Sequence, residues 1–129
     1  MTERGAVSIL VISVLAALIV LGLAVTGAGL VIDARAHAVN AADAAALAAA
    51  VASFPPLGSG AAPNSAARAM AVANGARLVE CRCPVVPDWV PRSVTVRVGV
   101  EVSLPLVGRR TVFATSEAEF DPTAALVIR

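Results

Sequence analysis

The stretch VNAADAAALAAA, from Val39 to Ala50, decides the fold of this chain. It is almost pure alanine, and alanine has the highest helix propensity of all residues. No proline and no glycine stands between Ile32 and Ser53, so nothing in this part of the sequence interrupts a helix. Each alanine buries little apolar surface, but its small side chain lets a sheet or a second helix approach closely. The stretch therefore predicts a helix that other elements pack against.

An uncharged run of 27 residues precedes the alanine-rich stretch: AVSILVISVLAALIVLGLAVTGAGLVI, from Ala6 to Ile32. About 20 apolar residues span the core of a bilayer, whereas the apolar part of a cleavable signal peptide has about 7–15 residues. We therefore expect a retained transmembrane helix over residues 6–32 that continues outside the membrane to residue 53. Pro55 and Pro56 then end the helix.

The charges beside this run do not decide its orientation, because one arginine lies near each end (Arg4 and Arg35). The segment before the run has only five residues and is easily left in the cytoplasm. We expect a single-pass protein of the bacterial cell membrane with its N-terminus in the cytoplasm and its C-terminal domain outside.

Small residues gather near the outer end of the run. Small side chains allow transmembrane helices to approach closely, although alanine-rich helices contain such pairs by chance. The helix-packing candidates are Gly22, Thr26, Gly27 and Gly29. The few hydroxyl groups in the run are expected to bond back to carbonyls of their own helix.

A second, shorter helix is predicted over Asn64–Ala73, after a loop rich in proline, glycine and serine. Asn74 and Gly75 form its C-terminal signal. Four residues are expected to pack one face of this helix on a sheet: Ala66, Ala69, Met70 and Ala73.

Three strands are predicted, over Arg77–Cys83, Ser93–Leu104 and Arg110–Phe120, with a turn at Pro105–Gly108. The second strand alternates strictly, with a valine or leucine at every even position, which is typical of a strand with one buried face. In the first strand Val79, Cys81 and Cys83 are expected on one side.

The fold class expected from these elements is α+β, with a pilin-like layout: the long helix, the short helix and a small antiparallel sheet of about three strands. We divide the chain into an anchoring helix (1–53), a loop (54–63) and a small extracytoplasmic α+β domain (64–129). Such a sheet has a shallow core, so the long helix must help to cover it.

The composition argues against several classes of function. The net charge of +1 does not favour a nucleic-acid partner, and aromatic residues make up only 3% of the chain, too few for surfaces that stack bases or sugars. There is no glycine-rich phosphate loop, and no serine stands with a base. We expect no catalytic residues, no cofactor, no metal and no enzymatic activity.

The two cysteines, Cys81 and Cys83, leave three alternatives open: free thiols on the sheet, an intermolecular disulfide, or a redox pair, since a bridge between residues two apart is strained. They cannot complete a tetrahedral zinc site, and His37 is the only histidine. Glu117 and Glu119 share one face of a strand, where solvation is the expected role.

The start RGAVSILV (Arg4–Val11), the long apolar helix and the block NAADAAALAAA (Asn40–Ala50) together resemble the N-terminal segment of TadE/TadG-like proteins of tight-adherence (Flp) pilus assembly. The resemblance covers about Arg4 to Ala50. It implies a minor pseudopilin or assembly factor, with pilin-like or secretion proteins, or further copies of the chain, as partners. The residues that carry the motif are Asn40, Ala42, Asp43, Ala44, Ala45, Ala46 and Leu47.

The same resemblance implies a processing site between Gly5 and Ala6, because a prepilin peptidase cuts pseudopilins after a glycine. The family usually has a glutamate five residues after that glycine, and this chain has Leu10. Three roles are open for Asp43: it is a solvated helix residue, it pairs with Arg35 or His37, or it contacts a partner in the assembly.

Three hypotheses follow. The first is a membrane-anchored TadE/TadG-like pseudopilin or assembly component of a pilus or related secretion apparatus. The second is a signal-anchored extracytoplasmic binding or sensor module unrelated to pili. The third is a small redox enzyme that uses Cys81 and Cys83.

Overall fold

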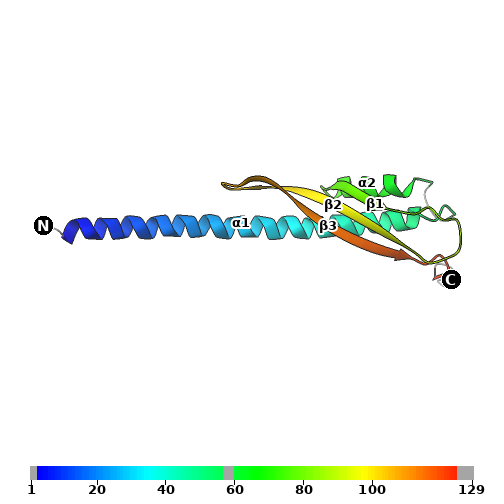
Figure 1. Ribbon diagram of the computed structural model, residues 1–129, viewed down its shortest axis with the longest axis horizontal. Coiled ribbons are helices and arrows are strands. Elements are labelled where there is room, and N and C mark those ends of the chain that lie inside the picture. Colours follow the sequence, from blue (N-terminus) through cyan, green and yellow to red (C-terminus); the bar gives the residue numbers. More distant parts are fainter. Residues whose placement is uncertain (1–2, 57–59, 125–129) are drawn as a thin grey trace.

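A computed structural model describes residues 3–56 and 60–124. It contains one very long helix, one short helix and one sheet, so the α+β fold class predicted from the sequence is confirmed (Figure 1). The elements are α1 (Glu3–Ala52), α2 (Pro63–Ala73), β1 (Arg77–Arg82), β2 (Arg92–Leu104) and β3 (Gly108–Phe120).

Helix α1 is a single rod of 50 residues, about 75 Å long at 1.5 Å per residue. The uncharged run and the alanine-rich stretch thus form one uninterrupted helix, as the absence of proline and glycine between Ile32 and Ser53 predicts. The other elements gather around its C-terminal half, and its N-terminal half projects from them (Figure 1).

The three strands form an antiparallel sheet in the order β1-β2-β3. The β2–β3 hairpin is regular along its length, with pairs that run from Arg92 and Phe120 at the open end to Leu104 and Gly108 beside the turn. The alternation predicted for β2 is confirmed, because Val94, Val96 and Val98 are completely buried. One face of the sheet therefore turns toward α1.

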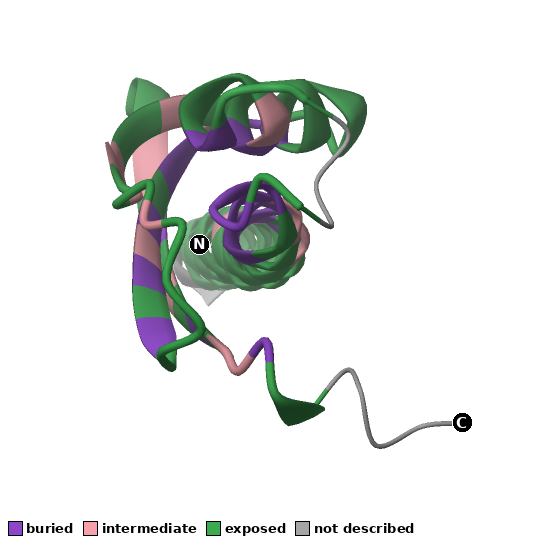
Figure 2. Ribbon diagram, turned by 90° about the vertical axis from the view of Figure 1, so that its right-hand side faces the viewer, coloured by how far each residue is buried: buried purple, intermediate pink, exposed green. Residues whose placement is uncertain are grey.

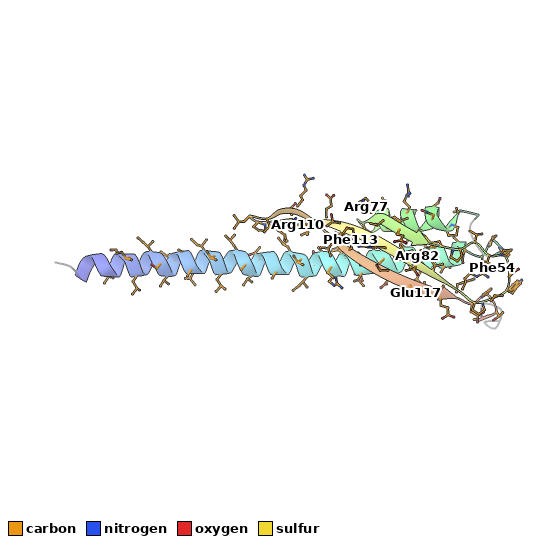
Figure 3. The ribbon with its side chains drawn as sticks, in the orientation of Figure 1. Phe54, Arg77, Arg82, Arg110, Phe113 and Glu117 are labelled. Carbon is orange, nitrogen blue, oxygen red and sulfur yellow. A yellow bond between two sulfur atoms is a disulfide. The ribbon has the colours of Figure 1, made fainter. Side chains whose placement is uncertain are left out.

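The core lies where the sheet and α2 wrap around the C-terminal half of α1 (Figure 2). The part of α1 in this core consists of alanine, which allows both partners to come close to the helix axis. Its fully buried members are Ala38, Ala41, Ala42, Ala45, Ala46 and Ala49. The small sheet thus depends on the long helix for its cover, as the sequence predicts.

The face that α2 buries differs from the predicted one. Its buried residues are Pro63, Ala67 and Ala71, whereas Ala69 and Met70 are exposed. Ala67 and Ala71 belong to the core cluster formed with the alanines of α1, and α2 packs more on α1 than on β1. The prediction was wrong because alanines lie on more than one face of α2, so the sequence does not determine which face packs.

Strand β1 also departs from the predicted alternation. A bulge lies between Leu78 and Glu80, where the register with β2 shifts by one residue. Leu78 and Cys81 pack against the core as a result, and Val79 is exposed. The extra residue of a bulge moves the following side chains to the other face.

Candidate functional site

The N-terminal half of α1 presents apolar side chains on all sides. From Val7 to Ile32 every residue is exposed except Gly27, which is half-buried. Within the described residues α1 is the helix that is long and apolar enough to cross a membrane, judged by length and composition. This segment is therefore compatible with a single-pass membrane anchor.

Two hydroxyl groups inside this half bond to carbonyls of the same helix. Ser13 Oγ donates to the carbonyl of Ile9 at 2.8 Å, and Thr26 Oγ1 donates to the carbonyl of Gly22 at 2.8 Å. The back-bonding predicted for these two hydroxyls is confirmed. Around Gly22, Gly27 and Gly29 an added Cβ would meet no atom within 4 Å, so a second helix has room to approach. Their role in helix packing stays a prediction.

The alanine-rich stretch divides into a buried and an exposed side. Ala42, Ala45 and Ala46 are completely buried in the core, and Ala44 is half-buried. The three larger residues of the motif point away from the core and are exposed: Asn40, Asp43 and Leu47. The small residues therefore hold the domain on the helix, and the larger ones are available to a partner.

The exposed residues Val39, Asp43, Leu47 and Val51 follow one another at intervals of four along α1. Such spacing places them on one side of the helix. We call these four residues the exposed stripe.

Beside the exposed stripe, Asp43 and Leu47 line a shallow groove of about 290 Å³ together with Ser116–Glu119 of β3. Glu117 and Glu119 line this groove as well as Asp43, so three acidic residues border it together with the apolar Leu47 and Ala118. The sequence predicts these acidic residues separately, and only the packing of β3 along α1 brings them together.

Most of α1 matches a known family. Residues 5–52 match the family model Tad, described as "Putative Flp pilus-assembly TadE/G-like". Over these residues the chain is similar to TadE/TadG-like proteins. The resemblance seen in the sequence is thus confirmed over this part of the chain. No curated protein and no solved structure matches the chain.

The Tad segment ends at residue 52, where α1 itself ends. It contains both the exposed apolar half of the helix and the alanines of the core. The predicted processing site, Gly5 and Ala6, lies in the first turns of α1, and the fifth residue after Gly5 is Leu10. Cleavage there stays a prediction.

The two cysteines are joined to each other in the structure. Cys81 and Cys83, which are two residues apart in the sequence, form a disulfide, and their Cα atoms are 5.4 Å apart. They lie at the end of β1, and both pack partly against the core. The structure thus differs from two of the three alternatives, the free thiols and the intermolecular disulfide.

His37 is exposed, and within the described residues no group of three or more His, Cys, Asp or Glu side chains could hold a metal ion.

Arg92, at the end of the domain farthest from the hairpin tip, is buried, and no sequence pattern predicts its contacts. Arg92 donates to the backbone carbonyls of Ser53, Val86, Asp88 and Val90. Its guanidinium also lies 5.3 Å from the centroid of the Phe54 ring. The arginine therefore ties the end of α1 to the loop before β2.

Phe54 is completely buried at the centre of this end of the domain. Its ring centroid lies 4.9 Å from that of Trp89, in an edge-to-face arrangement, and 6.1 Å from that of Phe120. The only sequence signal for this cluster was the presence of three of the chain's four aromatic residues near proline-rich loops, which is too weak to predict contacts.

Proposed function

We propose that this protein is a membrane-anchored, pseudopilin-like component of a Flp (tight-adherence) pilus or a related secretion apparatus, and that it acts through protein contacts and not by catalysis. One observation carries the proposal: the Tad segment coincides with a single helix that is apolar and exposed in one half and forms the core of a domain in the other.

This architecture couples the membrane segment rigidly to the domain. No loop separates the two parts, because α1 passes from the apolar half into the core without a break. A partner that holds the domain therefore also sets the position of the helix in the membrane. A subunit that has to be placed in an assembly benefits from such a coupling.

The exposed stripe and its acidic groove are the surface that we assign to the partner. Leu47 supplies an exposed apolar centre, and Asp43, Glu117 and Glu119 supply negative charge around it. Apolar centres with a polar rim are common in protein interfaces. We expect the partner, a pilin-like protein or another copy of the chain, to present an apolar residue beside arginine or lysine.

Site-specific photo-crosslinking in the native host tests this assignment. A photoreactive amino acid in place of Leu47 is expected to crosslink to a pilin or pilus-assembly protein, or to a second copy. The same amino acid in place of Val72, an exposed residue of α2, is the matched control. Equal products at both positions, or none at Leu47 in cells that make pili, would contradict the proposal.

The intact mass of the protein from its native membrane separates the two versions of the proposal. Loss of Met1–Gly5 would support a processed pseudopilin despite Leu10. Retention of these residues would leave a permanently anchored assembly factor. A defined soluble ligand for the domain, with no pilus partner, would instead support the binding-module hypothesis.

A further inference from the structure

The tip of the β2–β3 hairpin is apolar and strongly exposed. It consists of Pro105, Leu106 and Val107, and Leu106 and Val107 are 92% and 56% exposed. Tight turns usually carry glycine, asparagine, aspartate or serine. Here Leu106 adopts a φ of +66°, a conformation that disfavours residues with a Cβ atom. The chain thus places a large apolar side chain at a position where a small or polar one would be easier to accommodate.

This tip extends beyond the packed core, along the apolar half of α1 (Figure 1). Residues 104–107 of the hairpin and α1 residues between Val20 and Ile32 line a common groove of about 640 Å³. Those α1 residues are alanine, glycine, valine, leucine and isoleucine, so both walls of the groove are apolar.

The position of the bilayer along α1 follows from its charges. The helix has no charged residue between Arg4 and Asp33, and this stretch is about eight residues longer than the roughly 20 residues needed to cross a bilayer core. A core that begins at Ala6 ends near residue 26, and a core that ends at Ile32 begins near residue 13. Both limits place the boundary of the hydrocarbon core beside the hairpin tip.

The charges beside the tip have the sign that a membrane surface attracts. Arg109 and Arg110, both exposed, are the only charged residues between Val102 and Thr115. They pair with Ser103 and Val102, so they leave the hairpin on opposite faces. Arginine side chains can extend from apolar surroundings toward phosphate groups. The tip is thus apolar at its end, and the two arginines follow directly after the last residue pair beside the turn.

We propose that the β2–β3 hairpin tip inserts into the leaflet on the domain's side of the bilayer, with Arg109 and Arg110 against lipid phosphates. The proposal rests on the membrane anchoring assumed under Proposed function. If α1 crosses the membrane, lipid surrounds this part of the helix, so acyl chains fill the groove beside the tip. The hairpin then gives the domain a second contact with the membrane and fixes its tilt.

Depth-dependent quenching of tryptophan fluorescence tests the insertion. The full-length protein is reconstituted into vesicles of phosphatidylcholine and phosphatidylglycerol, with or without brominated acyl chains. The reporters are Leu106→Trp and Val107→Trp in the tip, Leu15→Trp within α1, and Thr115→Trp, an exposed residue of β3 away from the tip. The unsubstituted protein supplies the contribution of Trp89.

Insertion predicts blue-shifted emission that brominated lipid quenches for both tip reporters and for Leu15→Trp, while Thr115→Trp stays unquenched. Quenching of Leu15→Trp alone would overturn the tip insertion and leave the anchoring intact. If brominated lipid quenches neither the tip reporters nor Leu15→Trp, the anchoring of α1 in the membrane is overturned as well. A blue shift at the tip without quenching would show that another protein copy covers the groove, which also overturns the proposal.

A second experiment tests whether Arg109 and Arg110 contact lipid phosphates. The double variant R109Q/R110Q, combined with Leu106→Trp, is expected to lose part of the quenching in vesicles that contain phosphatidylglycerol. The loss should be smaller in vesicles of phosphatidylcholine alone, because the attraction to anionic headgroups is absent there. An unchanged quenching in both lipids would overturn the assignment of the arginines to phosphate.

Discussion

Arg92 is a buried cation whose acceptors are backbone carbonyl oxygens, recorded at 3.3 Å to Ser53 and 3.1 Å to Val90, with further bonds to Val86 and Asp88. Among the residues that the structure describes, carbonyl dipoles and no carboxylate compensate its charge. The forked guanidinium suits this task because it directs five N–H donors along fixed directions in one plane.

We expect Arg92→Met to lower the free energy of unfolding by about 2–4 kcal/mol, because hydrogen bonds to a charged group contribute about 1.5–3 kcal/mol each and the lost charge offsets part of that sum. Arg92→Lys should not restore stability, since an ammonium cannot reach the same set of carbonyls. Denaturant unfolding of the full-length protein in detergent, followed by Trp89 fluorescence, measures both. Wild-type stability in the lysine variant would contradict this account.

Gly99 makes room for Phe113 on the outer face of the sheet. The two residues are cross-strand partners, and Arg97 places its guanidinium 4.7 Å from the centroid of the Phe113 ring. A Cβ on Gly99 would lie 3.0 Å from Thr111 Cγ2 and 3.2 Å from Phe113 Cε1. A larger side chain must therefore displace the ring.

Gly99→Val should destabilise the protein by about 1–3 kcal/mol, the usual cost of overpacking, although valine favours strands. Ser103→Val, on the same face but exposed, is the control and should change stability by less than about 0.5 kcal/mol. Thermal unfolding of both variants measures these changes in stability. A Gly99→Val variant as stable as the unsubstituted protein would show that the Phe113 ring moves aside at no cost.

Asp121 accepts two hydrogen bonds from Thr123, from Oγ1 at 2.6 Å and from the backbone N–H at 2.8 Å. Bonds to the ionised form lower the pKa of this carboxyl below its usual value of 3.8. The resulting stabilisation is present above the unfolded pKa and is lost as the pH falls through the folded one. Thr123→Val should raise the Asp121 pKa in an NMR titration, whereas Thr123→Ser should leave it low; equal values in both variants would contradict this.

At the scale of elements, the alanines of α1 set the distance between the helix and the sheet. Ala45 is completely buried, while Ala36 on the same helix is exposed. Protein cores are packed densely, so additional methyl groups there force side chains or backbone to shift.

Ala45→Leu should therefore lower the free energy of unfolding by about 1–3 kcal/mol or more. Ala36→Leu should have an effect within about 0.5 kcal/mol, because leucine is nearly as good a helix former and the site is open to solvent. Denaturant unfolding of the two variants in detergent compares them directly. Equal effects would show that the core does not depend on small residues at this helix.

At the scale of the whole molecule, a domain outside the cytoplasm, as proposed above, would lie in an oxidising compartment, where the Cys81–Cys83 disulfide persists. Protein purified without reductant and then denatured should not react with maleimide at Cys81 or Cys83, and should react at both after reduction. Cys81→Ser should expose the remaining thiol. Because the bridge closes a very short loop, its removal should change stability little. Reaction at both cysteines before reduction would place the domain in a reducing compartment.

Much of the fold could be predicted from short stretches of sequence. The length of α1 follows from the lack of helix-breaking residues before Pro55, and the buried face of β2 follows from its alternating valines. The acidic groove could not be predicted in this way, because Asp43 and Glu117 are far apart in sequence and meet only when β3 packs along α1.

What the sequence by itself determined is therefore local: the one continuous helix, the hairpin with its buried face, and the Tad segment. The tertiary structure alone decided which face α2 buries, where the bulge of β1 falls, what Arg92 binds, and that the hairpin tip lies beside the apolar half of α1. The physical reason is that propensity and periodicity act over a few residues. Contacts between distant residues depend on which close-packed arrangement of whole elements leaves the fewest voids and unpaired polar groups.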